Sequence, residues 1–452
     1  MRILQLCTRF PPAPGGVETH VLEISKAMRS RGHEVTVLTS DLYSETPFLR
    51  LQERDSKMGM ATGRARAPLE EEVEGVPVRR FRAWTPGGEA HYVFYPGMIT
   101  GALSHDADII HAHSYGYFQA NVAPFVGRIR RLPTVLTAHF HPRWSTWGGD
   151  KRRMLRGIYD STVGQWALNH FDIIIAHTRS EVRLMAELGL NTSGKRVRVL
   201  PAGVDFSKFE PPPDGTQFRE FFGIPRGERV VLYTGRLAVN KGLMVLAEAA
   251  PLVLREHPDT RFVLAGGDMG VKDALLKRLE ELGIRERFLL TGHIADEALF
   301  RSAYGACDVF VLPSEYEAFG LVLLEAMASS KPVVATAVGG VPEVLGLEYT
   351  EKNLASREVD GWSGRRRSGL GRREAPQEGG AERRFGRAIE TSCGLIVDYG
   401  DAAALAGGIS RLLADEGLRR RMGEAGRERV RRHFNWDAVT EALLSIYGEL
   451  TR

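Results

Sequence analysis

Short apolar runs alternate with helical segments along this 452-residue chain, and the alternation limits the folds it can adopt. Strand-like runs of a first series occupy residues 2–7, 34–39, 109–112, 134–138, 173–177 and 197–200. Between the first two runs, apolar residues from Val17 to Met28 recur at helical spacing, and Gly32 follows as a suitable C-cap. Strands that are each followed by a helix predict a doubly wound parallel sheet of the α/β class.

A proline-rich stretch at residues 201–213 interrupts this rhythm, and a second series of strands follows it. The second series comprises residues 230–234, 262–265, 288–291, 308–312 and 333–336. The chain is too long for one ordinary core. We therefore expect two Rossmann-like domains, 1–203 and 204–433, that face one another across a cleft and bind ligands at the carboxyl ends of their strands.

The junction between the apolar run 308–312 and the next helical segment carries the strongest chemical signal. Glu317 lies before this helix, Glu325 lies in its second turn, and Gly320 allows a ligand to approach the backbone. The first N–H groups of a helix attract anions such as a diphosphate. The two carboxylates are eight positions apart, which at ~1.5 Å of rise per residue is on the order of 10 Å. That length matches a nucleotide-sugar, and it exceeds the ~5 Å between the carboxyl groups of a retaining glycosidase.

This segment resembles the E-x7-E motif of retaining GT-B glycosyltransferases of family 4. Further elements of that family follow in order across nearly the whole chain, namely Gly15-Gly16, His139, Gly235-Arg236, Lys241-Gly242 and Gly339-Gly340-Val341-Pro342-Glu343. The resemblance implies a GT-B fold, with the acceptor mainly on the first domain and the donor on the second. It also implies that a last helix, within 434–452, returns to the first domain.

The resemblance assigns roles in the donor half to named residues. Arg236 and Lys241 would hold the diphosphate and neutralise charge on the departing nucleotide. Glu317 would face the transferred sugar, and Glu325 would accept hydrogen bonds from the ribose hydroxyls. The resemblance also implies that Phe319, Gly320 and Leu321 bind the nucleotide-sugar through their backbone amides. Ile294, beside His293, would take part in selecting the base.

In the first half, the resemblance implies that Gly16 lies near the diphosphate and the acceptor, and that His139 approaches the transferred sugar. Gly-Gly alone also satisfies an ordinary turn, and a histidine at a strand end is often structural. His111 with His113, and His139 with His141, form two His-x-His pairs that could bind zinc, but no acidic or thiolate partner accompanies them. We therefore expect no catalytic metal.

The function implied is a metal-independent, retaining hexosyltransferase of glycan biosynthesis. It would move a hexosyl unit from a UDP- or GDP-sugar to a hydroxyl of a lipid, glycan or small molecule by front-face substitution, with no cofactor besides the donor. Two alternatives stay open: another GT-B enzyme, such as a sugar-nucleotide epimerase or a phosphorylase, and a non-catalytic protein that binds sugar-nucleotides or a membrane surface.

Composition indicates the cellular location and the partners that we expect. Three dispersed cysteines suggest no disulfide framework, and the short apolar start of the chain resembles a first strand rather than a signal peptide, so we expect a cytoplasmic protein. The net charge of +4 is small. Local positive charge at 128–131 and 151–156 fits an ordinary solvated face, or peripheral contact with an anionic membrane at its inner face or with a phosphate-bearing acceptor. The arginines within residues 348–392 could suggest RNA binding, but few aromatic residues are interleaved with them, so we expect no nucleic-acid partner.

Two stretches depart from the family pattern. Residues 43–74 are polar with little periodicity and predict an exposed loop. Residues 348–392 separate two elements that the family joins by a short turn, and their arginines and glycines include few apolar residues, which predicts a flexible insertion. The sequence Asp106-Ala107-Asp108 resembles the D-x-D of metal-dependent transferases, but it directly precedes a strand, and we interpret it as structural.

Overall fold

The computed structural model describes residues 1–13, 15–45, 48–50, 69–84, 92–140, 149–190, 197–347 and 388–451. The chain divides into two compact units. Unit 1 comprises Met1–Asp205 and His433–Arg452, and unit 2 comprises Phe206–Arg432. The C-terminal helix α17 (Trp436–Leu450) belongs to unit 1, where it packs against α1 (Gly16–Ser30).

Unit 1 contains an eight-stranded sheet in the order β10-β9-β8-β7-β1-β2-β6-β5. Its strands are β1 (Arg2–Leu6), β2 (Glu34–Ser40), β5 (Glu70–Val73), β6 (Val76–Phe81), β7 (Ile109–His113), β8 (Thr134–Thr137), β9 (Ile173–Ala176) and β10 (Val197–Val199). All neighbours pair in parallel except β5 with β6. The other helices are α3 (Gly97–Ser104), α4 (Phe118–Arg130), α5 (Gly149–Ser161), α6 (Val163–His170) and α7 (Arg179–Glu187), and β3 (Leu42–Glu45) pairs with β4 (Phe48–Arg50).

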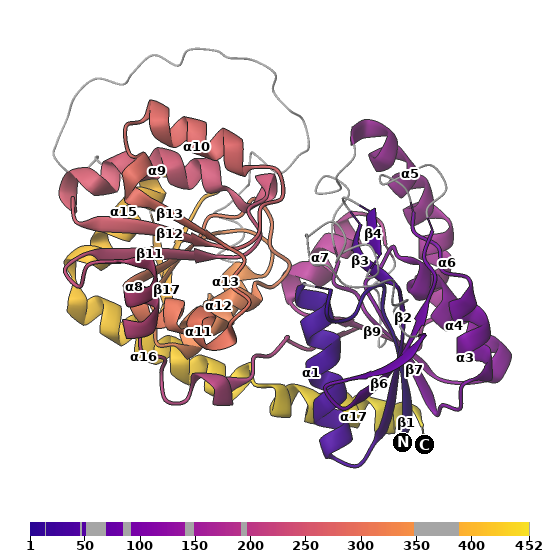
Figure 1. Cartoon of the computed structure of the whole chain (residues 1–452). Coiled ribbons are helices and arrows are strands. Elements are labelled where there is room, and N and C mark those ends of the chain that lie inside the picture. Colours follow the sequence, from indigo (N-terminus) through magenta and orange to yellow (C-terminus); the bar gives the residue numbers. More distant parts are fainter. Residues whose placement is uncertain are drawn as a thin grey trace, which may run out of the picture. The chain divides into compact units, whose positions relative to one another are not determined.

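Unit 2 contains a seven-stranded sheet in the order β13-β12-β11-β14-β15-β17-β16. Its strands are β11 (Arg229–Thr234), β12 (Thr260–Ala265), β13 (Phe288–Gly292), β14 (Val309–Leu312), β15 (Val333–Thr336), β16 (Ile389–Glu390) and β17 (Gly394–Val397). Its helices are α8 (Thr216–Phe222), α9 (Leu243–Glu256), α10 (Lys272–Glu281), α11 (Glu297–Ala306), α12 (Leu321–Ala328), α13 (Val341–Val344), α15 (Ala402–Ala414) and α16 (Glu416–His433). Figure 1 shows α9 and α10 on one face of this sheet and α8 and α11 on the other. Both units are thus α/β layers of the Rossmann type, as predicted.

Aspartates that directly precede strands fasten the amino edges of both sheets. The carboxylate of Asp108 accepts hydrogen bonds from the backbone N–H of Arg2 at 2.8 Å and from its guanidinium at 2.7 Å. Asp172 and Asp308 likewise accept a hydrogen bond from a backbone N–H at the start of the neighbouring strand, at Thr134 and Val230, each at 2.8 Å. The structural role predicted for Asp108 is confirmed.

The prediction of an exposed loop over residues 43–74 was wrong at both ends. Residues 42–45 and 48–50 form β3 and β4, and residues 51–68 lie outside the described residues. Residues 70–73 form β5, which pairs with β6, and Val76 and Val78 of β6 are buried beside Cys7 and Phe10. This hairpin escaped notice because β5 itself is mostly acidic and lies at the sheet edge, where one strand needs little hydrophobic periodicity. Of the predicted insertion, residues 388–392 are described and include β16, while residues 348–387 lie outside the described residues.

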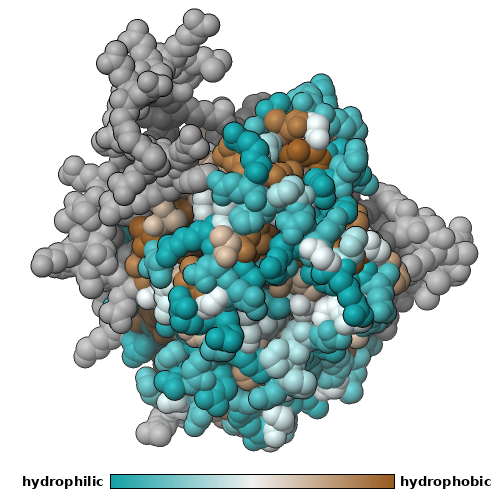
Figure 2. Space-filling view, turned by 90° about the vertical axis from the view of Figure 1, so that its left-hand side faces the viewer, coloured by the Kyte–Doolittle hydropathy of each residue, from teal (hydrophilic) through white to brown (hydrophobic). Residues whose placement is uncertain are grey.

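Polar side chains cover most of the face drawn in Figure 2, where hydrophobic ones occupy small separate areas. Among the described helices, none has both the length and the hydrophobicity needed to cross a bilayer. Cys7, Cys307 and Cys393 are buried thiols, and burial raises the pKa of Cys7 and of Cys307 to about 12. These two thiols therefore stay protonated and act as small core residues.

Candidate functional site

The strand order of unit 2 reverses between β11 and β14. From β11 the chain proceeds outward through β12 and β13, and from β14 it proceeds the other way through β15 and β17. At such a switch point the loops that leave the two strands diverge and open a crevice at their carboxyl ends. The loops after β11 and β14 contain the predicted residues Arg236, Lys241, Glu317 and Gly320.

Lys241 and Glu317 meet at this switch point. The Nζ atom of Lys241 donates to Oε2 of Glu317 at 2.6 Å, and the two side chains are 16% and 18% exposed. Lys241 is placed by a short 3-10 turn, Val239–Lys241, whose following residue, Gly242, has a left-handed φ of 65°. A Cβ on Gly242 would lie 1.9 Å from the carbonyl oxygen of Pro313, so only glycine lets the two loops approach this closely.

The Gly339-Gly340 turn fixes the backbone of Glu317. The N–H of Gly340 donates to the carbonyl oxygen of Glu317 at 3.1 Å, and a Cβ on Gly339 would lie 1.9 Å from that same oxygen. The N–H of Glu315 also donates to the carbonyl oxygen of Asn240 at 2.9 Å. The loops after β11, β14 and β15 therefore form one hydrogen-bonded assembly that sets the position of the Lys241–Glu317 pair.

Arg236 lies beside this pair along the sequence and is exposed. Within the described part of the chain it makes no ion pair, while the hydroxyl of Tyr233 donates to its carbonyl oxygen at 2.8 Å. The N–H of Gly235 donates to Ala265 at 2.9 Å and the N–H of Gly266 donates to Gly292 at 3.0 Å, which joins the loops after β11, β12 and β13. Ile294, two residues beyond Gly292, is partly buried.

Gly320 begins helix α12 from a left-handed conformation, with φ of 87°. No side chain caps this helix among the described residues, and its first turn contains no acidic residue. Phe319 is 5% exposed, so it belongs to the core, and Leu321 is the partly buried first residue of the helix. The amino end of α12 thus presents backbone amides next to Glu317, as an anion site requires.

Glu325 lies one turn into α12, and its carboxylate is bound by another side chain of unit 2. The hydroxyl of Tyr304, on α11, donates to its carboxylate, and Thr234 lies 2.8 Å from that same hydroxyl. Burial raises the pKa of Glu325 to about 7, although the hydrogen bond from Tyr304 opposes that shift. Sequence reasoning did not find Tyr304, because nothing in the pattern of α11 distinguishes it from a core tyrosine.

Unit 1 has its own switch point, between β1 and β7. Gly16 is the exposed first residue of α1, directly after the β1 loop. At the preceding residue, Gly15, a Cβ would lie 2.0 Å from Oε2 of Glu18, and Glu18 pairs with Arg9 at 2.7 Å. The Gly15-Gly16 turn therefore leaves room for a buried ion pair at the start of the helix.

His139 follows β8 in a left-handed conformation, with φ of 40°, and is only 9% exposed. Its Nδ1 atom lies 3.1 Å from Nε2 of His177, and its ring centroid lies 5.1 Å from that of His20 on α1. The sequence predicted His139 but not these two neighbours. His20 lies beside Val21 and four residues before Ile24, on the buried face of α1, which was the available signal.

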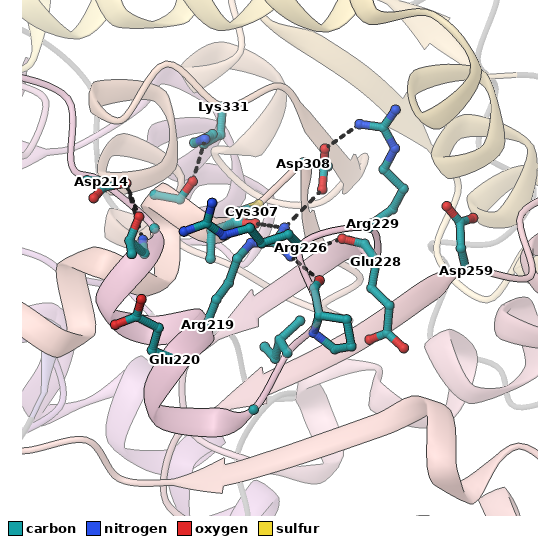
Figure 3. A pocket seen from close by; sticks show the side chains of 18 residues that line it. Asp214, Arg219, Glu220, Arg226, Glu228, Arg229, Asp259, Cys307, Asp308 and Lys331 are labelled. Carbon is teal, nitrogen blue, oxygen red and sulfur yellow. Dashed lines mark hydrogen bonds and ion pairs between the residues drawn. The ribbon is translucent and has the colours of Figure 1, made fainter.

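A pocket of about 940 Å³ in unit 2 lies at the opposite edge of the sheet, where the strands begin. Figure 3 shows Asp308 paired with arginines and Lys331 bonded to a carbonyl oxygen, whereas Glu220 and Asp259 have no contact drawn to another lining residue. Arg229 and Arg219 lie 3.1 and 3.7 Å from Asp308, and Lys331 donates to the carbonyl oxygen of Gly305 at 3.0 Å. These contacts fasten strand ends, and we do not assign the pocket to the site.

Two family models match the chain. Residues 14–208 match Glycosyltransferase Family 4, and residues 214–360 match Glycosyl transferases group 1. The chain is 31% identical to a D-inositol 3-phosphate glycosyltransferase of Corynebacterium jeikeium, over 76% of this chain and 72% of that protein. It is 28% identical to a protein of the same name from Xylanimonas cellulosilytica, over 97% of this chain and 92% of the relative.

Solved structures agree in fold. The sucrose-phosphate synthase of Thermosynechococcus elongatus matches with a TM-score of 0.69 at 21% identity, over 100% of this chain and 99% of that chain. Anabaena HepE, solved with UDP and glucose, matches with a TM-score of 0.68 at 19% identity, over 100% of both chains. The chain therefore has the GT-B fold and belongs to the group 1 glycosyltransferases, with a first half of the family 4 type.

Proposed function

We propose that this chain is a retaining hexosyltransferase that takes a UDP- or GDP-hexose and transfers the hexosyl unit to a hydroxyl group of a lipid, glycan or small molecule. The Lys241–Glu317 pair carries this proposal, because it combines a cation and a carboxylate beside the amino end of α12. Related structures support a nucleotide-sugar donor, since Anabaena HepE was solved with UDP, with UDP and glucose, and with UDP-glucose.

Donor binding would rearrange the pair. The diphosphate takes the ammonium group of Lys241 from Glu317, and the guanidinium of Arg236 and the first amides of α12 add positive charge. The carboxylate of Glu317 is then available to accept hydrogen bonds from the hydroxyls of the sugar. Glu325, oriented by Tyr304, accepts the ribose hydroxyls, while Ile294 lies in the loop that we assign to the base.

The transfer step balances without a further reactant. The bond between the anomeric carbon and the diphosphate oxygen breaks, and the electron pair leaves with the nucleoside diphosphate. The acceptor oxygen bonds to the same face of the anomeric carbon, and its proton passes to a diphosphate oxygen. Lys241 and Arg236 stabilise the charge that develops on the leaving group, at a few kcal/mol for each well-placed group. His139 and Gly16 are assigned to the acceptor side.

A donor panel tests the assignment. Purified protein is titrated with UDP- and GDP-hexoses in a calorimeter, and donor hydrolysis is followed in parallel. We expect binding of at least one donor, weaker binding after Glu325→Ala, and lower turnover after Lys241→Ala. Lys272→Ala, an exposed lysine of α10, is the matched control and should behave as wild type. Absence of heat and turnover with every donor would contradict the proposal.

We further propose that the protein works in the cytoplasm as a peripheral protein of an anionic membrane, with helices α4, α5 and α6 of unit 1 as the contact surface. Their exposed apolar side chains are Phe125, Ile129, Met154, Leu155, Ile158, Val163 and Trp166. Exposed Arg128 and Arg131 accompany them. Apolar side chains beside cations are typical of surfaces that bind anionic lipid.

Two of the arginines first offered for this contact serve the fold instead. Arg130 donates to the carbonyl oxygen of Ala102 at 3.1 Å, and Arg156 pairs with Asp160 at 2.8 Å. Sedimentation with vesicles tests the remaining surface. Vesicles with anionic phosphatidylglycerol should retain the protein more than purely zwitterionic ones, and Ile129→Asp should weaken retention. Equal retention by both vesicle types would exclude the electrostatic contact.

A further inference from the structure

Four buried histidines gather at the switch point of unit 1. His113 ends β7, His139 follows β8, His177 follows β9, and His20 comes from α1, the helix after β1. Their exposed fractions are 0%, 9%, 4% and 4%. One ring nitrogen from each of His20, His113 and His139 lies within 4.8 Å of the corresponding nitrogens of the other two. The parallel order β8-β7-β1 produces this convergence, because all three strands end at one edge.

The hydrogen bonds of His113 define which of its nitrogens carries the proton. Its Nε2 atom lies 2.8 Å from Oε1 of Gln5, whose amide nitrogen is directed to the sulfur of Met28. An amide oxygen only accepts, so Nε2 of His113 carries the hydrogen and Nδ1 carries a lone pair. That Nδ1 is buried and has no hydrogen-bond partner among the described residues.

A relay fixes the tautomer of His139 in a similar manner. Nδ1 of His177 lies 3.0 Å from the carbonyl oxygen of Leu200, so it must donate, and Nε2 of His177 becomes an acceptor. Nδ1 of His139, 3.1 Å away, donates to that acceptor. Nε2 of His139 therefore holds a lone pair, and the outward N–H is anchored, as it is in histidines that bind metals.

His20 supplies the third imidazole. Its Nδ1 atom is buried, again with no hydrogen-bond partner within the described part of the chain. A buried ring nitrogen that has no hydrogen-bond partner costs on the order of 1–3 kcal/mol.

We propose that His20, His113 and His139 bind one divalent transition-metal ion of the Zn²⁺ class. Neutral imidazoles suit Zn²⁺, Co²⁺ and Ni²⁺, and three protein ligands leave a fourth position for water or another ligand. Zn–N bonds of about 2.0–2.1 Å would place the nitrogens about 3.3 Å apart, so the rings close in by small side-chain rotations.

This set differs from the His-x-His pairs suggested by the sequence. His111 is excluded, because its two ring nitrogens lie 2.6 Å from the hydroxyl of Tyr447 and 2.8 Å from that of Thr137. His141 lies outside the described residues. His20 takes the place of His111 and His141 in the set. Its position in the chain gave no indication that it lies near the strand histidines.

The test is a metal titration of the full, untagged chain after removal of metals with a chelator. Co²⁺ reports its coordination by visible d–d absorption, and calorimetry with Zn²⁺ gives affinity and stoichiometry. We expect one ion per chain, and affinity at least about tenfold lower in His20→Ala and in His113→Gln. His433→Ala, which changes an exposed histidine outside the cluster, should bind as wild type.

Circular dichroism first establishes that each variant is folded, and if His113→Gln fails to fold, His20→Ala decides the question. The proposal is overturned if wild type takes up no stoichiometric ion, or if the folded variants bind as tightly as wild type. The measurement requires no turnover, so its outcome is independent of whether a donor sugar is found.

Discussion

Replacing Tyr304 with phenylalanine should show how much the tyrosine hydroxyl stabilises the partly buried carboxylate of Glu325. The tyrosine hydroxyl donates to Glu325 and lies 2.8 Å from the hydroxyl of Thr234. Because the carboxylate takes the only phenolic proton, Thr234 must be the donor to Tyr304. The substitution removes both hydrogen bonds and keeps the ring, so packing changes little.

The loss of stability caused by Tyr304→Phe depends on pH. A hydrogen bond to an ionised group contributes about 1.5–3 kcal/mol, and one between neutral groups about 0.5–1.5 kcal/mol. With a pKa of about 7, Glu325 is ionised at pH 8.5 and protonated at pH 5.5. The loss of stability from Tyr304→Phe should therefore be about 1 kcal/mol larger at pH 8.5, whereas the part due to Thr234 is the same at both pH values.

A double-mutant cycle with Glu325→Gln isolates that difference. Unfolding of the full chain in urea is followed by circular dichroism at both pH values for wild type, the two single variants and the double variant. Tyr233→Phe is the matched control, since its hydroxyl donates to a backbone carbonyl, that of Arg236, at 2.8 Å. A coupling energy near zero at pH 8.5, or one equal at the two pH values, would refute the reasoning.

Three further predictions concern the same unit. The pKa of Glu325 is raised from 4.5 to about 7, so its contribution to stability is fully present below pH 4.5 and is lost by pH 7, by at most about 3 kcal/mol. Urea unfolding across that range should show this fall in wild type, and a fall of equal size in Glu325→Gln would assign it elsewhere. Gly242→Ala should reduce donor affinity more than tenfold in calorimetry, because its Cβ would lie 1.9 Å from the Pro313 oxygen and would displace Lys241. Unchanged affinity would show that this loop does not bind the donor. Asp308→Ala should cost about 1–2 kcal/mol in the free energy of unfolding, because the N–H of Val230 and the half-exposed Arg229 lose their partner, while no measurable cost would show that this edge is not fastened there.

Local patterns predicted much of the fold, because buried parallel strands are continuous apolar runs with a helix after each. The Lys241–Glu317 contact agrees with the predicted motifs, since both residues follow strands at one switch point. The Tyr304–Glu325 bond could not be predicted, because it joins two helices that each look ordinary alone. The β5–β6 hairpin escaped because an acidic edge strand shows little hydrophobic periodicity, whereas His20 escaped because its partners are distant in the sequence.

The aspartates that tie the starts of the strands have a consequence for how such a protein can change. Strand alignment is secured at one rim of each sheet, whereas the opposite rim consists of glycine-containing turns that hold the candidate ligand-binding groups. Loops at the second rim can therefore vary in length and chemistry while the register stays anchored elsewhere. Attempts to redirect this scaffold toward a new sugar should alter those turns and leave the aspartate-bound rim untouched.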